Sequence, residues 1–168
     1  IVNTKKAAES VYQKVKDGAP ANVHCFHLST NMCPAHRMET LEELRALLKN
    51  GASVFLISTS LIEAGVDVSF PIVIRSFAGL PSILQAAGRC NRNGEQALGR
   101  VYVWTLSEEK LERLPFVQHG QALTADVMLM AREERLDLQD LVCIRLYFDK
   151  EQKLSLIHIS EPTRQEAI

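Results

Sequence analysis

The chain has 168 residues, of which 46% are hydrophobic and 23% are charged, proportions typical of a globular protein with one substantial core. The formal net charge is −1, so the surface as a whole does not attract nucleic acid, and any such binding needs a local groove. The four cysteines form no Cys-x-x-Cys pair, which indicates reduced thiols and predicts a cytoplasmic protein. We recognise no signal peptide and no apolar run long enough for a membrane, and therefore expect no membrane partner.

Predicted strands and helices alternate from the start of the chain. Ile1-Val2-Asn3 is typical of the end of a strand and the first residue is not Met, so we expect the sequence to begin in mid-protein. Helical spacing of apolar residues predicts a helix over Thr4–Asp17. A short apolar run predicts a strand over Val23–Leu28. Pro34 is typical of a first helical turn, and the helix that it begins has the apolar stripe Met38, Leu41, Leu44 and Leu48.

The next part of the pattern predicts three more strands and one helix. The strands are Ser53–Ser58, Ile72–Arg75 and Val101–Thr105, the last with Trp104 in the core, and the helix is Pro81–Cys90. Beyond Leu106 the sequence becomes helical and more charged, and Glu108-Glu109-Lys110 is typical of a helix start. Alternating elements with unbroken apolar strands predict an α/β fold, in which helices cover both faces of a mainly parallel sheet. A helical C-terminal extension follows it.

The last residues have a different character. Residues 154–164 read LSLIHISEPTR, which is similar to the translation of a sequencing adapter. We therefore interpret residues 154–168 as an artefact outside the fold. The alternative is a real edge strand, because Leu154, Leu156 and Ile159 are apolar.

The most informative segment of the chain is Gln85–Glu95, which reads QAAGRCNRNGE. Gln85, Arg89 and Arg92 are spaced i, i+4 and i+7, so on a helix they would form one polar stripe. Gly88 beside this stripe would let another surface approach closely. Two arginines and a glutamine without an acidic neighbour are suited to binding a phosphate group. The alternative interpretation is an ordinary solvated helix face.

Polar residues also follow two of the predicted strands. Thr59–Asp67 comes directly after Ser53–Ser58, and Ser29, Thr30 and Arg37 follow Val23–Leu28. Parallel sheets bind ligands at the carboxyl ends of their strands. Hydroxyl and backbone N–H groups there can bind phosphates, whereas a carboxylate can accept from a ribose hydroxyl. We therefore expect one ligand-binding edge, although serine and threonine in turns often only bond the local backbone.

These segments together resemble a known family. Four segments, taken in chain order, resemble four motifs in the second RecA-like lobe of superfamily 2 helicases. They are VNTKKAA, LSTNMCPAHR, Ser58–Asp67 and QAAGRCNRNGE. The amino-acid sequences of the last two segments are most similar to those of the CRISPR-associated helicase-nuclease of type I interference systems. The resemblance implies a three-layer RecA-like lobe over residues 1–105 and an extension over residues 106–153 that leads toward an accessory domain.

The resemblance also implies roles for individual residues. Arg89 and Arg92 match the arginine fingers that reach the γ-phosphate of ATP, a group whose loss in a phosphoryl-transfer site typically costs about 10³-fold or more. Gln85 matches the position that senses the γ-phosphate or its attacking water. Gly65 and Asp67 match the motif that joins nucleotide to nucleic acid, with Asp67 on the ribose. The positions expected to follow a DNA backbone are Ser29, Thr30, Arg37 and Thr59.

The sequence has no G-x-x-x-x-G-K-[ST] and no Asp-Glu box for Mg²⁺. The resemblance therefore implies that ATP with Mg²⁺ is held mainly by a first RecA-like lobe in the same parent chain. Closure of the two lobes over ATP would move them along single-stranded DNA. The other implied partners are an HD-type nuclease domain and the CRISPR surveillance complex. We expect this chain alone not to hydrolyse ATP.

Two alternatives stay open at this point. The chain could be the lobe of another superfamily 2 motor, such as an RNA helicase or a DNA-repair translocase, or a phosphate-binding module without motor function. A metal site among His24, Cys25, His27, Cys33 and His36 is not expected, because no ligand pair has the usual spacing. Glu63 is expected to pair with a nearby base or to have no partner.

Overall fold

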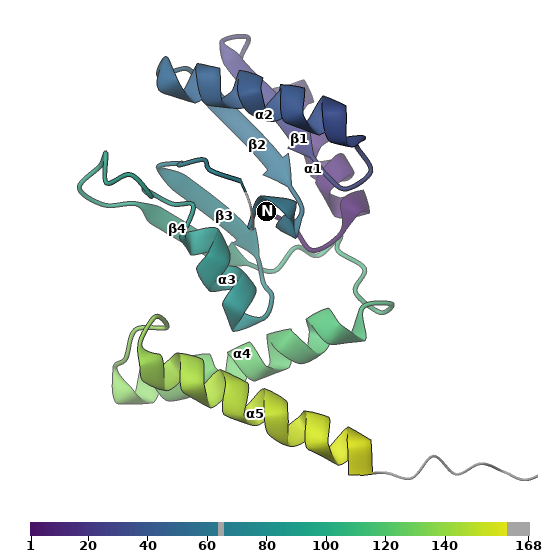
Figure 1. Cartoon of the computed structure of the whole chain (residues 1–168), viewed down its shortest axis with the longest axis vertical. Coiled ribbons are helices and arrows are strands. Elements are labelled where there is room, and N and C mark those ends of the chain that lie inside the picture. Colours follow the sequence, from purple (N-terminus) through teal and green to yellow (C-terminus); the bar gives the residue numbers. More distant parts are fainter. Residues whose placement is uncertain (64–65, 161–168) are drawn as a thin grey trace, which may run out of the picture.

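The computed structural model describes the backbone of residues 1–63 and 66–160 and the side chains as far as Lys153, apart from residues 64 and 65. Helices and strands alternate in the first two thirds of the chain (Figure 1). They are α1 (Lys5–Gly18), β1 (Val23–Leu28), α2 (Pro34–Lys49), β2 (Ser53–Ser58), the 3₁₀ turn η1 (Ser60–Ile62), β3 (Ile72–Ser76), α3 (Leu80–Ala87) and β4 (Arg100–Trp104). Two long helices follow, α4 (Pro115–Glu134) and α5 (Leu141–Ser160).

The strands pair in parallel, as the sequence predicts. β1 pairs with β2 so that Val23 faces Ser53, and β3 pairs with β4 so that Ile72 faces Arg100. The first two residues lie between these pairs: the Val2 amide donates to the Ser58 carbonyl (2.9 Å), and the Ser76 amide donates to the Ile1 carbonyl (2.8 Å). Figure 1 shows the N-terminus at this central position. The carboxyl ends of all four strands therefore lie along one edge of the molecule.

Helices α1 and α2 cover opposite faces of the β1–β2 pair. Leu41 and Leu44 of α2 pack with Leu28, whereas Ala7 and Ala8 of α1 pack with Ile57. Successive strand residues point to opposite faces, so alternate apolar residues of these two strands supply both cores.

The α4–α5 hairpin packs on α3 and not on the β1–β2 half. Leu80 of α3, Val127 of α4 and Tyr147 of α5 belong to one buried cluster. Figure 1 shows the two long helices side by side below α3. Gly79 and Gly120 allow this approach, because a Cβ atom on Gly120 would lie 3.1 Å from the Gly79 Cα.

The structure corrects several details of the sequence interpretation. α3 ends at Ala87 and not at Cys90. Met38 is 60% exposed on α2, and Trp104 is 56% exposed on β4, whose five residues are all exposed. Glu109 does not begin a helix: α4 starts at Pro115, and the Glu109 carboxylate instead accepts from the backbone at the start of α1.

The tail predicted to be an artefact falls partly outside the description. The backbone of residues 154–160 continues α5, which differs from the alternative of an edge strand, and residues 161–168 lie outside the described part of the chain. Among residues 1–63 and 66–160, no helix combines the length and apolar character that crossing a membrane requires.

Candidate functional site

The segment of Gln85, Arg89 and Arg92 is a helix end followed by a turn, so the three side chains do not form a stripe on one helix. Gln85 lies in the last turn of α3 and is exposed. Gly88 caps the helix, and the Arg89 amide donates to the Ala86 carbonyl at 3.0 Å. Asn91 then takes a left-handed conformation with φ of 47°, which asparagine tolerates better than most residues. Arg92 is therefore placed by a turn and not by helical periodicity.

Arg89 is bound to the segment that follows β2. Its Nε donates to the Ile62 carbonyl at 3.0 Å, and its Nη2 donates to the Glu63 carbonyl at 2.7 Å. These carbonyls belong to η1 and the residue after it, within the segment Ser58–Asp67 that resembles a helicase motif. The planar guanidinium holds two carbonyls in a fixed direction, so two of the predicted motifs form one unit.

Backbone bonds reinforce the same unit. The Phe70 amide donates to the Arg89 carbonyl (2.9 Å), and the Asn91 amide donates to the Phe70 carbonyl (2.8 Å). Arg92 Nη1 lies 3.4 Å from Asp67 Oδ1, with side chains 43% and 79% exposed. The structure thus brings Gln85, Arg89, Arg92 and Asp67 to neighbouring segments. Gly65 lies outside the described residues.

A buried ion pair lies directly behind this unit. Arg75 Nε is 2.9 Å from Glu63 Oε1, and the two side chains are only 2% and 4% exposed. Burial raises the pKa of the Glu63 carboxyl and Arg75 opposes that rise. Burial likewise lowers the pKa of the Arg75 guanidinium, against the charges of Glu63 and Glu109. Opposite charges at this distance favour the ionised forms of both.

Sequence reasoning named Glu63 but overlooked Arg75. An arginine in the middle of the apolar strand IVIRS is a signal in itself, because charged residues are almost never buried without a partner. A search for acidic residues in the preceding loop would have found Glu63.

The ion pair extends into a polar network at the carboxyl ends of the strands. Arg75 Nη1 donates to Asn3 Oδ1 at 2.9 Å and to the Ser76 carbonyl at 3.0 Å. The carboxylate of Glu109 accepts from Asn3 Nδ2 (2.8 Å), from the Thr4 amide (3.1 Å) and from the Ser76 hydroxyl. The Glu109 side chain therefore lies at the N-terminus of α1, where the helix dipole favours an acidic residue.

A second asparagine orders the loop beyond Arg92. Asn91 Nδ2 donates to the Gln96 carbonyl (2.7 Å), and the Gln96 amide donates to Asn91 Oδ1 (3.0 Å). Gly99 passes so close that a Cβ there would lie 2.8 Å from the Asn91 Cβ. Asn91 thus fixes the turn that carries Arg92, a role that the sequence interpretation did not assign.

The predicted DNA-contact residues differ in their exposure. Thr30 is exposed and Arg37 is half-buried. Ser29 and Thr59 are only 1% and 7% exposed, and the Thr59 amide donates to the Leu28 carbonyl at 3.3 Å. Thr30 is therefore accessible at this edge and Arg37 partly so, whereas Ser29 and Thr59 are covered.

The histidines and cysteines of the first half do not gather. His27 stacks on Tyr12 with ring centroids 5.5 Å apart, and burial lowers the pKa of its imidazole. Within the described residues, no group of three or more His, Cys, Asp and Glu side chains could hold a metal ion.

Residues 1–95 match the family model described as the C-terminal part of the CRISPR-associated nuclease/helicase Cas3. The chain belongs to this Cas3 family. The matched range contains β1 to β3, α3 and the residues Asp67, Gln85, Arg89 and Arg92, whereas Gln96, Gly99 and Glu109 lie beyond it.

Individual Cas3 proteins agree with this family. The chain is 45% identical over 83 residues to the CRISPR-associated nuclease/helicase Cas3 of Haloferax volcanii, which is 48% of this chain and 9% of that protein. Crystal structures of T. fusca Cas3 share its fold. The first has a TM-score of 0.65 with 18% identity over 79% of this chain and 17% of that one, and the form with ATP has a TM-score of 0.64 with 16% identity over 90% and 20%. The chain thus spans about a tenth of the curated relative.

Proposed function

We propose that this chain is the C-terminal motor lobe of an ATP-dependent translocase that acts on single-stranded DNA in CRISPR type I interference. The observation that carries the proposal is the joining of the segment after β2 to the segment after α3. Bonds from Arg89 to the Ile62 and Glu63 carbonyls, together with the contact between Arg92 and Asp67, make these segments one edge. Membership in the Cas3 helicase family supports the proposal that the chain is part of a motor acting on nucleic acid.

In this proposal the exposed groups of the edge meet ATP. Arg92 is 43% exposed, and its one ion pair within the described residues is a 3.4 Å contact to an exposed carboxylate. Such surface pairs contribute little, typically about 0–1 kcal/mol. Its guanidinium is therefore free to exchange Asp67 for a phosphate, and Asp67 is then free to accept from a ribose hydroxyl. The exposed Gln85, in the last turn of α3, meets the γ-phosphate or its attacking water. Arg89 can approach a phosphate only at some cost to its two carbonyl bonds.

ATP fits this edge as a substrate that is only half enclosed. Guanidinium groups bind phosphate oxygens bidentately and stabilise the charge that develops in phosphoryl transfer. We assign the Mg²⁺ ion, the rest of the phosphate cradle and an HD-type nuclease domain to other parts of the parent chain. We assign single-stranded DNA to the edge at Thr30 and Arg37, above Ser29 and Thr59, and the CRISPR surveillance complex to the parent as its partner.

The experiment compares Arg92→Ala with the unchanged two-lobed parent in DNA-stimulated ATP hydrolysis. We expect kcat to fall about 10³-fold, as for other arginine fingers, with a much smaller change in KM because the first lobe holds most of the nucleotide. The matched control is Arg113→Ala, which removes an exposed arginine from the connector after β4 and should leave kcat unchanged. Full DNA-stimulated activity of the Arg92→Ala protein would show that Arg92 is not a finger.

A phosphate-binding module without motor function makes a different prediction. It requires the chain alone to bind ATP with useful affinity, whereas a lobe that supplies only fingers does not.

A further inference from the structure

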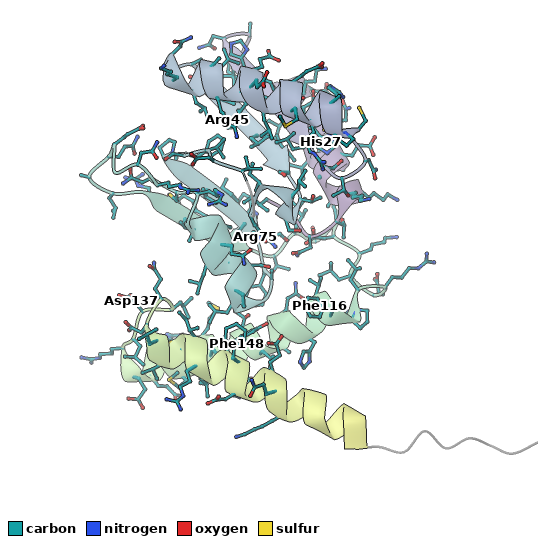
Figure 2. The ribbon with its side chains drawn as sticks, in the orientation of Figure 1. His27, Arg45, Arg75, Phe116, Asp137 and Phe148 are labelled. Carbon is teal, nitrogen blue, oxygen red and sulfur yellow. The ribbon has the colours of Figure 1, made fainter. Side chains whose placement is uncertain are left out.

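Glu63 is held from two sides. Its backbone carbonyl accepts from Arg89 Nη2 at 2.7 Å, and its carboxylate pairs with Arg75 Nε at 2.9 Å. Glu63 therefore links the Arg89 guanidinium to Arg75 of β3. Figure 2 labels Arg75 close to α3, below η1 and within the body of the lobe.

Arg75 is anchored on its other sides as well. It belongs to β3, whose pairing with β4 sets Arg75 opposite Val103. Its Nη1 donates to Asn3 Oδ1 at 2.9 Å and to the Ser76 carbonyl at 3.0 Å. A planar guanidinium with several fixed partners has one orientation, so Arg75 transfers the position of the sheet to the Glu63 carboxylate.

A buried ion pair of this kind is a poor device for stability. Removing two charges from water is costly, and well-packed apolar residues in the same place are often as stabilising or more so. Charge attraction keeps the Glu63 carboxylate beside Arg75 Nε, and the hydrogen bonds of Arg75 Nη1 to Asn3 and Ser76 give the guanidinium an orientation that apolar residues would not supply. We infer that Glu63 and Arg75 are a positioning clamp for Arg89: the pair fixes the carbonyls of residues 62 and 63, and these carbonyls orient the Arg89 guanidinium at the nucleotide edge.

The effect of the clamp on catalysis rests on the proposed function, whereas its effect on Arg89 does not. The decisive variant is therefore Glu63→Met combined with Arg75→Met, which removes both charges and fills their space. A merely structural pair predicts that this double variant behaves as the unchanged protein once it folds. A clamp predicts that the fold survives while Arg89 loses its fixed orientation.

The first measurement uses this chain, labelled with ¹⁵N, and follows hydrogen exchange of the Arg89 Nε–H by NMR. The signal is assigned by its loss in Arg89→Lys. We expect slow exchange in the unchanged chain, because the group donates to the Ile62 carbonyl at 3.0 Å. In the double variant we expect exchange as fast as that of the exposed Arg113. Retained protection in a folded double variant would overturn the inference.

The second measurement is DNA-stimulated ATP hydrolysis by the two-lobed parent. We expect the double variant to lose up to about 100-fold in kcat, the order expected from a small misplacement of a catalytic group, with KM for ATP little changed. In a parent that already carries Arg89→Ala, adding Glu63→Met and Arg75→Met should not lower kcat further, because the pair acts through the Arg89 side chain. If kcat falls by the same factor in the Arg89→Ala parent, the pair does not act through Arg89 and the inference is contradicted.

The matched control is the exposed pair of Lys14 and Glu108, which are 63% and 53% exposed. Replacing both with Met should change neither the exchange of Arg89 nor kcat. The proposed function and the clamp can be contradicted separately. If the parent protein without substitutions shows no DNA-stimulated ATP hydrolysis, the proposed function is wrong, and the hydrogen-exchange experiment still tests whether Glu63 and Arg75 orient Arg89.

Discussion

At the scale of single residues, the two arginines that the sequence treats alike have different surroundings. Arg89 donates to two backbone carbonyls at 3.0 and 2.7 Å, whereas in the described part of the chain Arg92 has one ion-pair contact, at 3.4 Å to an exposed carboxylate. Hydrogen bonds to a charged donor are each worth about 1.5–3 kcal/mol, so Arg89 is much the harder to redirect. Arg89 therefore joins the two segments of the edge, and we propose that Arg92 is the arginine that binds the ligand.

The buried pair leads to a prediction about pH. Arg75→Met leaves the Glu63 carboxylate buried without its cation, which should lower the free energy of unfolding by about 3–5 kcal/mol at neutral pH. Burial raises the pKa of Glu63 and Arg75 opposes that rise, so in the variant the folded-state pKa lies still higher. A carboxyl whose pKa is raised in the folded state gives stability at low pH, and this stability is lost as the pH rises through the raised value.

Urea unfolding of Arg75→Met at pH 5 and pH 7.5 tests this prediction. The deficit relative to the unchanged chain should be smaller at pH 5, where Glu63 can be protonated. Arg75→Met combined with Glu63→Met should show no such dependence, because the titrating group is gone. A deficit of the same size at both pH values would contradict the assignment.

At the scale of elements, the contact between α3 and α4 depends on two glycines. Gly79 caps α3 and Gly120 lies buried in α4, and a Cβ on Gly120 would come within 3.3 Å of both the Gly79 amide nitrogen and the Tyr147 hydroxyl. The backbone of Gly79 cannot move aside without shifting α3. This close approach places the α4–α5 hairpin directly on the helix that carries Gln85.

Gly120→Val should therefore destabilise the chain by about 1–3 kcal/mol through overpacking. The measurement is the urea midpoint, together with the slope of the transition, which falls if α4 and α5 no longer unfold with the lobe. Ala122→Val is the control, because Ala122 is exposed on the same helix and should lose only helix propensity, less than about 1 kcal/mol. Equal costs for both variants would show that the glycine contact is unimportant.

At the scale of the whole molecule, the site is open on one side. Gln85, Arg92 and Asp67 are all exposed, and no phosphate-cradling motif occurs in the sequence. Two or three exposed groups cannot offset the entropy lost when a small molecule binds.

We therefore expect the isolated chain to bind ATP only weakly, with a Kd of about 1 mM or higher, and not to hydrolyse it. Titration calorimetry measures the binding, and release of phosphate measures the hydrolysis. Adding the first lobe in the same polypeptide should produce DNA-stimulated hydrolysis. Micromolar affinity of the isolated chain would instead favour a phosphate-binding module.

The sequence by itself determined the alternation of elements, the parallel pairing and the motifs that mark the family. Apolar runs such as Ser53–Ser58 and stripes such as Leu41 and Leu44 are local patterns, and the backbone periods of 2 and 3.6 residues turn them directly into strands and helices. Caps are equally local: Thr4 begins α1, where its hydroxyl accepts from the Ala7 amide at 3.1 Å, and Pro34 begins α2.

Only the tertiary structure decided which polar groups meet. Glu109 lies 106 residues from Asn3 and Arg75 lies 72 residues from it, yet all three share one network. No local pattern encodes contacts of this separation, because they depend on how the sheet and the connector after β4 come together. The same applies to Arg89, whose fixed direction follows from carbonyls 26 and 27 residues earlier in the chain, and to Trp104, which a strand pattern places in a core but whose neighbours leave it exposed.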